Sequence, residues 1–279
     1  MSGYQVTTPP NFRNNSSTSP NAFLPEDASV GIWVFEELRI NSEEINLGDD
    51  AGLFGQVRRS IAIGAQAGEV NQGTGSSNGY AIAIGYQAGR SNQQTRSIAI
   101  GAEAAEFDQA DRCVAIGRWA GRSNQGTGTD VGYAVAIGAY CGQINQHGYA
   151  TAVGIDAGYE EQQHYAVAMG AYAGDYFQGT GAVAIGANAG YQNQSAYSVA
   201  IGNSAGANSQ GDYSVAIGNL AGQNSQSANS IVINANSAAL DAANTGLFIK
   251  PIRGLGFPAA GWFQLYYNPT TGELAYDST

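Results

Sequence analysis

A short hydrophobic phrase recurs along the chain between residues 61 and 234. In each copy a branched residue, an alanine and a second branched residue come before a glycine, as in Val-Ala-Ile-Gly at 199–202. Large side chains therefore alternate with methyl groups, and a period of two predicts a short β-strand. The closing glycine marks a corner, because glycine adopts positive φ angles without steric cost.

The spacing of the phrase is nearly constant. When its closing residue is taken as position 0 of a repeat, eight of the ten intervals are 16 residues long and the other two are 21. A fixed short period is typical of a solenoid, in which one coil is copied and stacked on the next. Position 0 is occupied by Gly64, Gly85, Gly101, Gly117, Gly138, Gly154, Gly170, Gly186, Gly202, Gly218 and Asn234.

Glutamine occupies position +8 of every repeat that is closed by a glycine. We expect each carboxamide to bond to the one in the next coil, because a buried amide without a partner costs about 1–3 kcal/mol. The alternative interpretation is a line of ion or glycan sites along the coils. The column comprises Gln72, Gln93, Gln109, Gln125, Gln146, Gln162, Gln178, Gln194, Gln210 and Gln226.

These columns predict an all-β fold, a parallel β-roll or solenoid of about eleven 16-residue coils with small β caps at both ends. Position −2 is alanine in every coil but the last. This indicates a crowded face, because a wet face would accept Ser, Thr or Lys. One coil is too thin to bury both faces of its strand, so we expect identical chains to cover the alanine face in a closed homo-oligomer.

The period is lost at both ends, which divides the sequence into four regions. The predicted boundaries are 1–28 for a flexible arm rich in Pro, Asn and Ser, 29–57 for an N-terminal capping segment, 58–238 for the β-roll and 239–279 for a C-terminal β cap. The arm cannot bury a core, so it serves either as a linker or as a docking segment for other structural proteins. In the C-terminal cap, turn residues between two aromatic-rich runs predict a hairpin.

Two features predict the surface that contacts a ligand. The 21-residue intervals insert five residues at one corner, and insertions in solenoids often carry the binding surface; tolerated loop growth is the alternative. Position −5 is often tyrosine, which either stacks on the sugar rings of a host surface glycan or forms a packing ladder. The candidate contacts are Thr74, Ser76, Thr127 and Asp130 in the insertions at 72–80 and 125–133, and Tyr80, Tyr133, Tyr149, Tyr165, Tyr197 and Tyr213 at position −5.

Composition narrows the function classes. The net charge is −11 with Lys250 as the single lysine, and an acidic surface repels nucleic-acid phosphates. No apolar run is long enough for membrane insertion. Cys113 and Cys141, like His147 and His164, fall at different repeat offsets. We therefore expect no disulfide, no metal site and no cofactor, with both histidines on the surface.

The phrase Ser-Val-Ala-Ile-Gly at 198–202 and 214–218, with related copies over about residues 58–238, resembles the head repeats of trimeric autotransporter adhesins, the YadA-like head. That resemblance implies a left-handed β-roll and a homotrimer. The longer Ala-Ile-Gly-Tyr-Gln-Ala-Gly at 83–89 is similar to repeats in fibre and surface proteins of large DNA viruses and some phages. The ending at 265–274 is similar to terminal segments of those proteins.

The resemblance implies a non-enzymatic structural fibre or spike protein on a virion surface that contributes to host attachment. An autotransporter would add a signal peptide, a coiled-coil stalk and a membrane anchor, and the sequence shows none of these, so we expect the viral fibre. The first alternative is the head domain of a bacterial trimeric surface adhesin. The second is a polysaccharide-cleaving tail spike, which needs paired carboxylates in a groove. Glu160 and Glu161 are the only such pair in the repeats.

Overall fold

The computed structural model describes residues 44–128, 132–252, 265–268 and 274–276. They all belong to the second of two compact units of the chain, Ser42–Thr279. The expected arm at 1–28, the first part of the N-terminal cap and the candidate contact Asp130 lie outside the described residues. The elements in the described ranges are strands, and none of these residues forms a helix with the length and apolarity of a membrane span.

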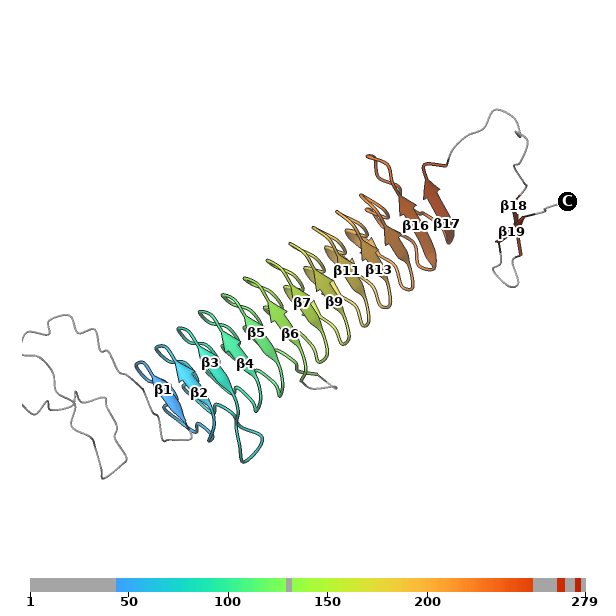
Figure 1. Cartoon of the computed structure of the whole chain (residues 1–279). Coiled ribbons are helices and arrows are strands. Elements are labelled where there is room, and N and C mark those ends of the chain that lie inside the picture. The colour runs from blue at the N-terminus through green and yellow to red at the C-terminus, as the bar shows by residue number, and fades with distance from the viewer. Residues whose placement is uncertain (1–43, 129–131, 253–264, 269–273, 277–279) are drawn as a thin grey trace, which may run out of the picture. The chain divides into compact units, whose positions relative to one another are not determined.

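A single parallel sheet of thirteen strands joins the coils. Its strands are β1 (Ile45–Leu47), β2 (Ile61–Ile63), β3 (Ile82–Ile84), β4 (Ile98–Ile100), β5 (Val114–Ile116), β6 (Val135–Ile137), β7 (Thr151–Val153), β9 (Val167–Met169), β11 (Val183–Ile185), β13 (Val199–Ile201), β15 (Val215–Ile217), β16 (Ser230–Asn234) and β17 (Gly246–Lys250). They follow one another in a row (Figure 1). Neighbours pair in register one coil apart, so that Val199 lies beside Val215.

A second, shorter sheet carries the return side of the coil. Its four parallel strands, in the order β14–β12–β10–β8, are β8 (Glu160–Gln162), β10 (Tyr176–Gln178), β12 (Gln192–Gln194) and β14 (Asn208–Gln210). Toward the N-terminus the same side continues as single-residue bridges, such as Phe54 with Val70 and Val70 with Ser91. The predicted C-terminal hairpin is present, formed by the antiparallel strands β18 (Leu265–Tyr267) and β19 (Leu274–Tyr276).

The parallel solenoid predicted from the period is confirmed, with about thirteen coils where the phrase predicted about eleven. The two added coils come from segments that the sequence assigned to caps. At the N-terminal end, β1 pairs in register with β2 and carries Asn46 where other coils have alanine. At the other end, β17 pairs with β16 and places Phe248 beside Val232. Because both strands lack the alanine, the phrase does not reveal them.

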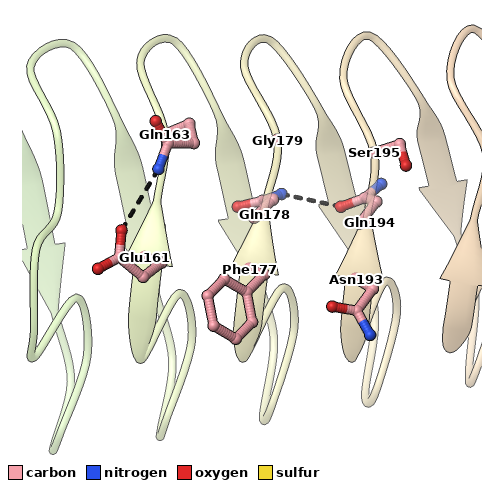
Figure 2. Close-up of a pocket in the computed structure, with 8 residues that line it drawn as sticks. All are labelled: Glu161, Gln163, Phe177, Gln178, Gly179, Asn193, Gln194 and Ser195. Atoms are coloured by element: carbon pink, nitrogen blue, oxygen red, sulfur yellow. Dashed lines mark hydrogen bonds between the residues drawn. The ribbon is translucent and has the colours of Figure 1, made fainter.

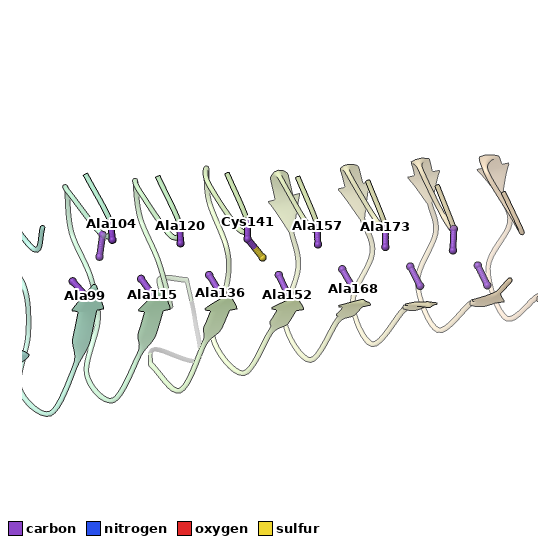
Figure 3. Close-up of a cluster of buried hydrophobic side chains, with 14 of the residues drawn as sticks. Ala99, Ala104, Ala115, Ala120, Ala136, Cys141, Ala152, Ala157, Ala168 and Ala173 are labelled. Carbon is purple, nitrogen blue, oxygen red and sulfur yellow. The ribbon is translucent and has the colours of Figure 1, made fainter. Parts of the chain in front are cut away.

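The alanine face is the interior of each coil, so the expectation that sister chains cover it is wrong. Alanines at positions −2 and +3, such as Ala152 and Ala157, face each other across the coil (Figure 3) and are fully buried within the single chain. The return segment lies so close to the strand that methyl groups and the glutamine column fill the space. The branched residues at −3 and −1 point outward instead, and Ile201 is 37% exposed.

Two glycine columns make this narrow coil possible. A Cβ on Gly85 would lie 2.6 Å from the carbonyl oxygen of Gly101 in the next coil, so position 0 has no room for a side chain. A Cβ on Gly89 at position +4 would lie 2.7 Å from Oε1 of Gln93. Both glycines also have positive φ angles, 129° and 53°. Close contact and conformation therefore both select glycine at these corners.

Candidate functional site

The glutamines at position +8 form a row of hydrogen bonds inside the coils. All ten predicted side chains are at most 2% exposed. Gln93 shows the pattern: its Nε2 donates to the carbonyl of Ile82 at 2.9 Å and to Oε1 of Gln109 at 3.0 Å. The row starts one coil earlier than the predicted column, at Gln56, and continues without a break to Gln210. The glutamine side chains of this column therefore face the interior of the coil.

The tyrosines at position −5 form stacked rows on one corner of the coil. Tyr133, Tyr149 and Tyr165 stack with ring centroids 5.1 and 5.2 Å apart. Tyr197 and Tyr213 form a second stack at 5.4 Å. All five have φ angles between 55° and 61°, which is unusual for bulky residues. Contact between successive rings offsets part of that cost, and the rings remain 42–61% exposed.

Arginines and a glycine divide this column. The guanidinium of Arg59 lies over the Tyr80 ring at 5.5 Å, and that of Arg112 lies over the first ring of the longer stack at 5.0 Å. Between the two stacks position −5 is Gly181, where an added Cβ would come within 3.0 Å of Cδ1 of Tyr197. The corner therefore presents two separate aromatic surfaces, and the arginines at its N-terminal end include two, Arg96 and Arg112, that pair with Asp111.

The two insertions leave the coil at the same corner. Thr74 forms a parallel bridge with Gln94, and Thr127 forms one with His147, which occupies the same repeat position as Gln94. Thr74 and Thr127 are half-buried, whereas Ser76 is exposed. The Ser76 hydroxyl donates at 2.6 Å to the carbonyl two residues further on, which holds the loop in a turn. The three candidate contacts that the structure describes in the insertions, Thr74, Ser76 and Thr127, therefore lie along the same corner of the solenoid.

Two histidines meet next to the second insertion, although the sequence separates them by repeat offset. The rings of His147 and His164 pack edge to face with centroids 4.8 Å apart. Burial and the neighbouring imidazole of His164 lower the pKa of His147, while the charge of Glu161 acts in the opposite direction. Their offsets differ by only one residue, and neighbouring coils are about 4.8 Å apart. Side chains of this length therefore reach each other across coils, which a column-by-column comparison misses.

Position +5 carries alternating charges in the N-terminal coils. Arg90 lies between Glu69, at 2.9 Å, and Glu106, at 3.5 Å. Arg122 binds Glu106 at 2.8 Å and lies over the Trp119 ring at 4.7 Å. These charges largely neutralise one another, so the corner does not present a cationic patch to a polyanion.

In the later coils position +5 carries one acidic residue, Asp175, and the carboxylates of Asp156 and Glu160 lie near it. Asp175 is only 4% exposed. Burial raises the pKa of its carboxyl group to about 7, and the charges of Asp156 and Glu160 add to the shift. Asp175 is therefore partly protonated at neutral pH, unlike an ordinary surface carboxylate.

An exposed aromatic residue interrupts the polar column at position +7. Asn145 donates to Glu161 Oε1 at 2.7 Å, but the next residue in this column is Phe177, which is 54% exposed. Figure 2 shows Phe177 between Glu161 and Asn193 in an open depression whose other lining residues are Gln163, Gln178, Gly179, Gln194 and Ser195. The sequence shows the signal, an aromatic residue in a column of Asn, Asp, Glu and Ser, but the predicted contacts did not include it.

The residues that catalysis would need are not arranged as a pair. Glu161 accepts a hydrogen bond from Asn145, whereas the charge of Glu160 acts on Asp175. Among the described residues, no three His, Cys, Asp or Glu side chains gather into a metal-binding group. The two cysteines are unpaired, and burial raises the pKa of each thiol to about 12, which makes them poor nucleophiles.

The fold defines a class of protein, a parallel β-solenoid repeat protein. The family model for the YadA head domain repeat matches residues 195–221 in two copies. That stretch contains strands β13 and β15 with the phrase at 198–202 and 214–218. No curated protein and no solved structure matches the chain. The chain is therefore a YadA-head-like β-solenoid repeat protein.

Proposed function

We propose that this chain is the head module of a trimeric, non-enzymatic surface adhesin, in which the solenoid displays a surface that contacts the target. The fold and the match to the YadA head repeats support this proposal. A virion fibre, which was expected from the sequence, would use the same architecture. The family match favours the cell-surface adhesin over the virion fibre.

The proposal of a homotrimer rests on the row of exposed branched residues on the outward face of the main sheet, called the outward stripe. Ile185, Ile201 and Ile217 lie side by side in register and are 37–39% exposed in the single chain. A continuous exposed apolar surface of this kind marks an association site in a soluble protein. A closed cyclic assembly would cover the stripe on every copy. The number three comes from the likeness to the YadA head.

The mass of the chain in solution tests the trimer. We expect light scattering after size exclusion to give three times the 28.8 kDa chain mass. Replacing Ile185→Lys together with Ile201→Lys should lower the mass to that of one chain, because charges would face each other across the interface. The matched control is Gln192→Lys with Asn208→Lys, a register pair on the exposed side of the second sheet, which should remain trimeric. A folded wild-type monomer at micromolar concentration would contradict the proposal.

We place target binding on the corner that carries the tyrosine stacks and the insertions, with a host surface glycan as the ligand. Exposed aromatic rings next to polar loop residues are suited to pyranose rings and their hydroxyls. A glycan panel probed with the purified chain should show binding that Tyr197→Ala with Tyr213→Ala removes without changing the oligomer mass. If the wild-type chain binds nothing on the panel, this part of the proposal fails. The arm at 1–28 is proposed separately as the segment that attaches the chain to neighbouring structural proteins.

A further inference from the structure

Phe177 is the one aromatic residue of position +7, a column that otherwise holds Asn, Asp, Glu or Ser from Asn71 to Ser225. Every residue of this column has a positive φ angle, and the angle of Phe177 is 58°. Asn and Asp adopt such angles far more readily than a bulky side chain does. The Phe177 ring is also 54% exposed, so it gains little from burial. A strained and exposed aromatic residue indicates a contact with something outside the coil.

The hydrogen bonds that link successive coils in this column stop at Phe177. In the preceding coils, Asn124 donates to Asn145 at 2.9 Å, and Asn145 donates to Glu161 at 2.7 Å. The Phe177 side chain has no donor or acceptor, so Glu161 and Asn193 on its two sides gain no partner from it (Figure 2). The polar atoms of these two neighbours are therefore left to solvent or to a ligand.

Two open depressions border the Phe177 ring. The first has a volume of about 270 Å³, and the residues around it include Glu161 and Gln163. The second has a similar volume, and the residues around it include Tyr176 and Asn193. Each is smaller than a pocket for a drug-sized molecule, which measures roughly 300–1,000 Å³. Their size therefore favours single side chains of an extended ligand.

The charge around these depressions is negative. Residues 123–249 contain seven Asp and Glu residues and no Lys or Arg. In the N-terminal coils carboxylates pair with arginines, as Glu69 does with Arg90 at 2.9 Å. The Glu161 carboxylate is instead held by the amide of Asn145 at 2.7 Å. An amide orients a carboxylate without neutralising its charge, so Glu161 attracts a cation from a partner.

We propose that this face of the second sheet binds a basic segment of a partner protein, with an arginine or lysine side chain seated between the Phe177 ring and the Glu161 carboxylate. The ring presents its face to the cation, and the carboxylate supplies the opposite charge. The absence of Lys and Arg from residues 123–249 keeps the surroundings free of charges that repel such a partner. The site lies on the return side of the coil, so the proposed trimer, which covers the outward stripe, leaves it accessible on every copy.

Fluorescence anisotropy of a labelled peptide of alternating Gly and Arg residues tests the site on the full chain. We expect saturable binding that weakens as the salt concentration rises, and no binding of the matched peptide of Gly and Glu. Phe177→Asn changes no charge and should weaken the binding by about tenfold, because the cation loses the ring. Glu161→Gln should weaken it by a similar factor, because the negative charge is lost while an oxygen remains to accept from Asn145.

Asp108→Asn is the matched control for Glu161→Gln. Asp108 is an exposed carboxylate of the same column and accepts a hydrogen bond from Asn92 at 2.8 Å, but its neighbours in the column are Asn92 and Asn124. We expect this variant to change the peptide affinity by less than about twofold. General attraction to an acidic surface predicts equal losses from both carboxylate variants and none from Phe177→Asn. That result overturns the proposal, as does a wild-type chain that does not bind the peptide.

The stability of Phe177→Asn separates binding from folding. Asn suits a positive φ angle, and its amide at this position can donate to Asn193 as Asn124 does to Asn145. The midpoint of urea unfolding should therefore rise while peptide binding falls. A lower midpoint would show that Phe177 stabilises the coil and would contradict the proposal. The same variant should keep the glycan binding proposed for the tyrosine corner; loss of glycan binding with unchanged peptide binding would assign the depression to a glycan instead.

Discussion

The inward and outward faces of the main sheet carry side chains of very different size. The inward face is lined by alanines that are fully buried, and the outward face by isoleucines and valines that remain partly exposed. In an ordinary domain the large apolar residues fill the core. Here the coil is too narrow for them, so methyl groups and the glutamine row fill the interior. The large apolar side chains stay on the outward face, where the proposed trimer would cover them, so folding and the proposed assembly depend on opposite faces.

Breaking the interior row should have the largest effect. In Gln146→Leu, Nε2 of Gln125 loses one of its two acceptors, Oε1 of Gln162 loses its donor, and the carbonyl of Val135 loses the donor that Gln146 supplies. Each unsatisfied buried group costs about 1–3 kcal/mol, so we expect the free energy of unfolding to fall by about 3 kcal/mol or more. Urea unfolding followed by circular dichroism measures it.

Gln226 provides the control for this prediction. Its Oε1 is buried without a hydrogen-bond partner, and the bonds between successive glutamines end at Gln210. Gln226→Leu should therefore destabilise the chain less than Gln146→Leu. Equal losses would show that the row contributes through packing volume and not through hydrogen bonds.

A size change tests the two faces of one strand directly. Ala136→Leu adds three carbons to a filled interior and should cost about 2–3 kcal/mol, whereas Ile137→Leu, one residue away on the outward face, should cost less than about 1 kcal/mol. Thermal unfolding of both variants under the same conditions gives the comparison. If Ala136→Leu is as stable as Ile137→Leu, the interior is wider than the structure shows.

These two faces also show what the sequence could and could not predict. The alternation of large and small residues at 199–202 predicts a strand, and the 16-residue spacing between copies predicts its register with the strands of neighbouring coils. The sequence pattern does not show which face of the strand lines the interior of the coil, because both small and large apolar residues are found on covered faces. The glycine at Gly89 indicates which face is closed, because a Cβ there would lie against the side chain of Gln93. This can be recognised only when the distance between the strand and the return segment is known.

The features that the sequence did not reveal depend on departures from the repeat. The coil of β1 has Gly48, Gly52 and Gln56 at the expected positions, and only Asn46 conceals it. The two histidines were separated by offset although their rings are in contact. The buried carboxyl group of Asp175 could not be recognised, since its burial depends on neighbours in other coils.

The corner of Asp175 makes stability depend on pH. The folded state raises the pKa of this carboxyl group from 3.8 to about 7. Between these values the folded chain holds a proton that the unfolded chain has released, so stability is highest at low pH and falls as the pH rises through this window. We expect a loss of about 2 kcal/mol between pH 5 and pH 8. In Asp175→Asn this dependence should disappear, as measured by urea unfolding at both pH values; an unchanged slope would contradict the assignment.

The outward tyrosine stack should contribute least. Tyr149 contacts Tyr133 on one side and Tyr165 on the other. Tyr149→Ala removes both contacts at an exposed site and leaves a residue with a positive φ angle, so we expect a loss of about 1 kcal/mol. Tyr213→Ala, which removes only one stacked contact, should cost less. Thermal unfolding resolves the difference, and equal losses would mean that stacking adds nothing to stability.

Chemical cross-linking of neighbouring positions tests the division between the two faces most directly. Ala200→Cys places a thiol inside the coil, where Cys141 is already accommodated, and Ile201→Cys places one on the outward stripe. With a short bismaleimide reagent we expect Ile201→Cys to give covalently joined chains and Ala200→Cys to remain as single chains on a denaturing gel. Joined chains from Ala200→Cys, with none from Ile201→Cys, would mean that the alanine face and not the branched face lies between copies.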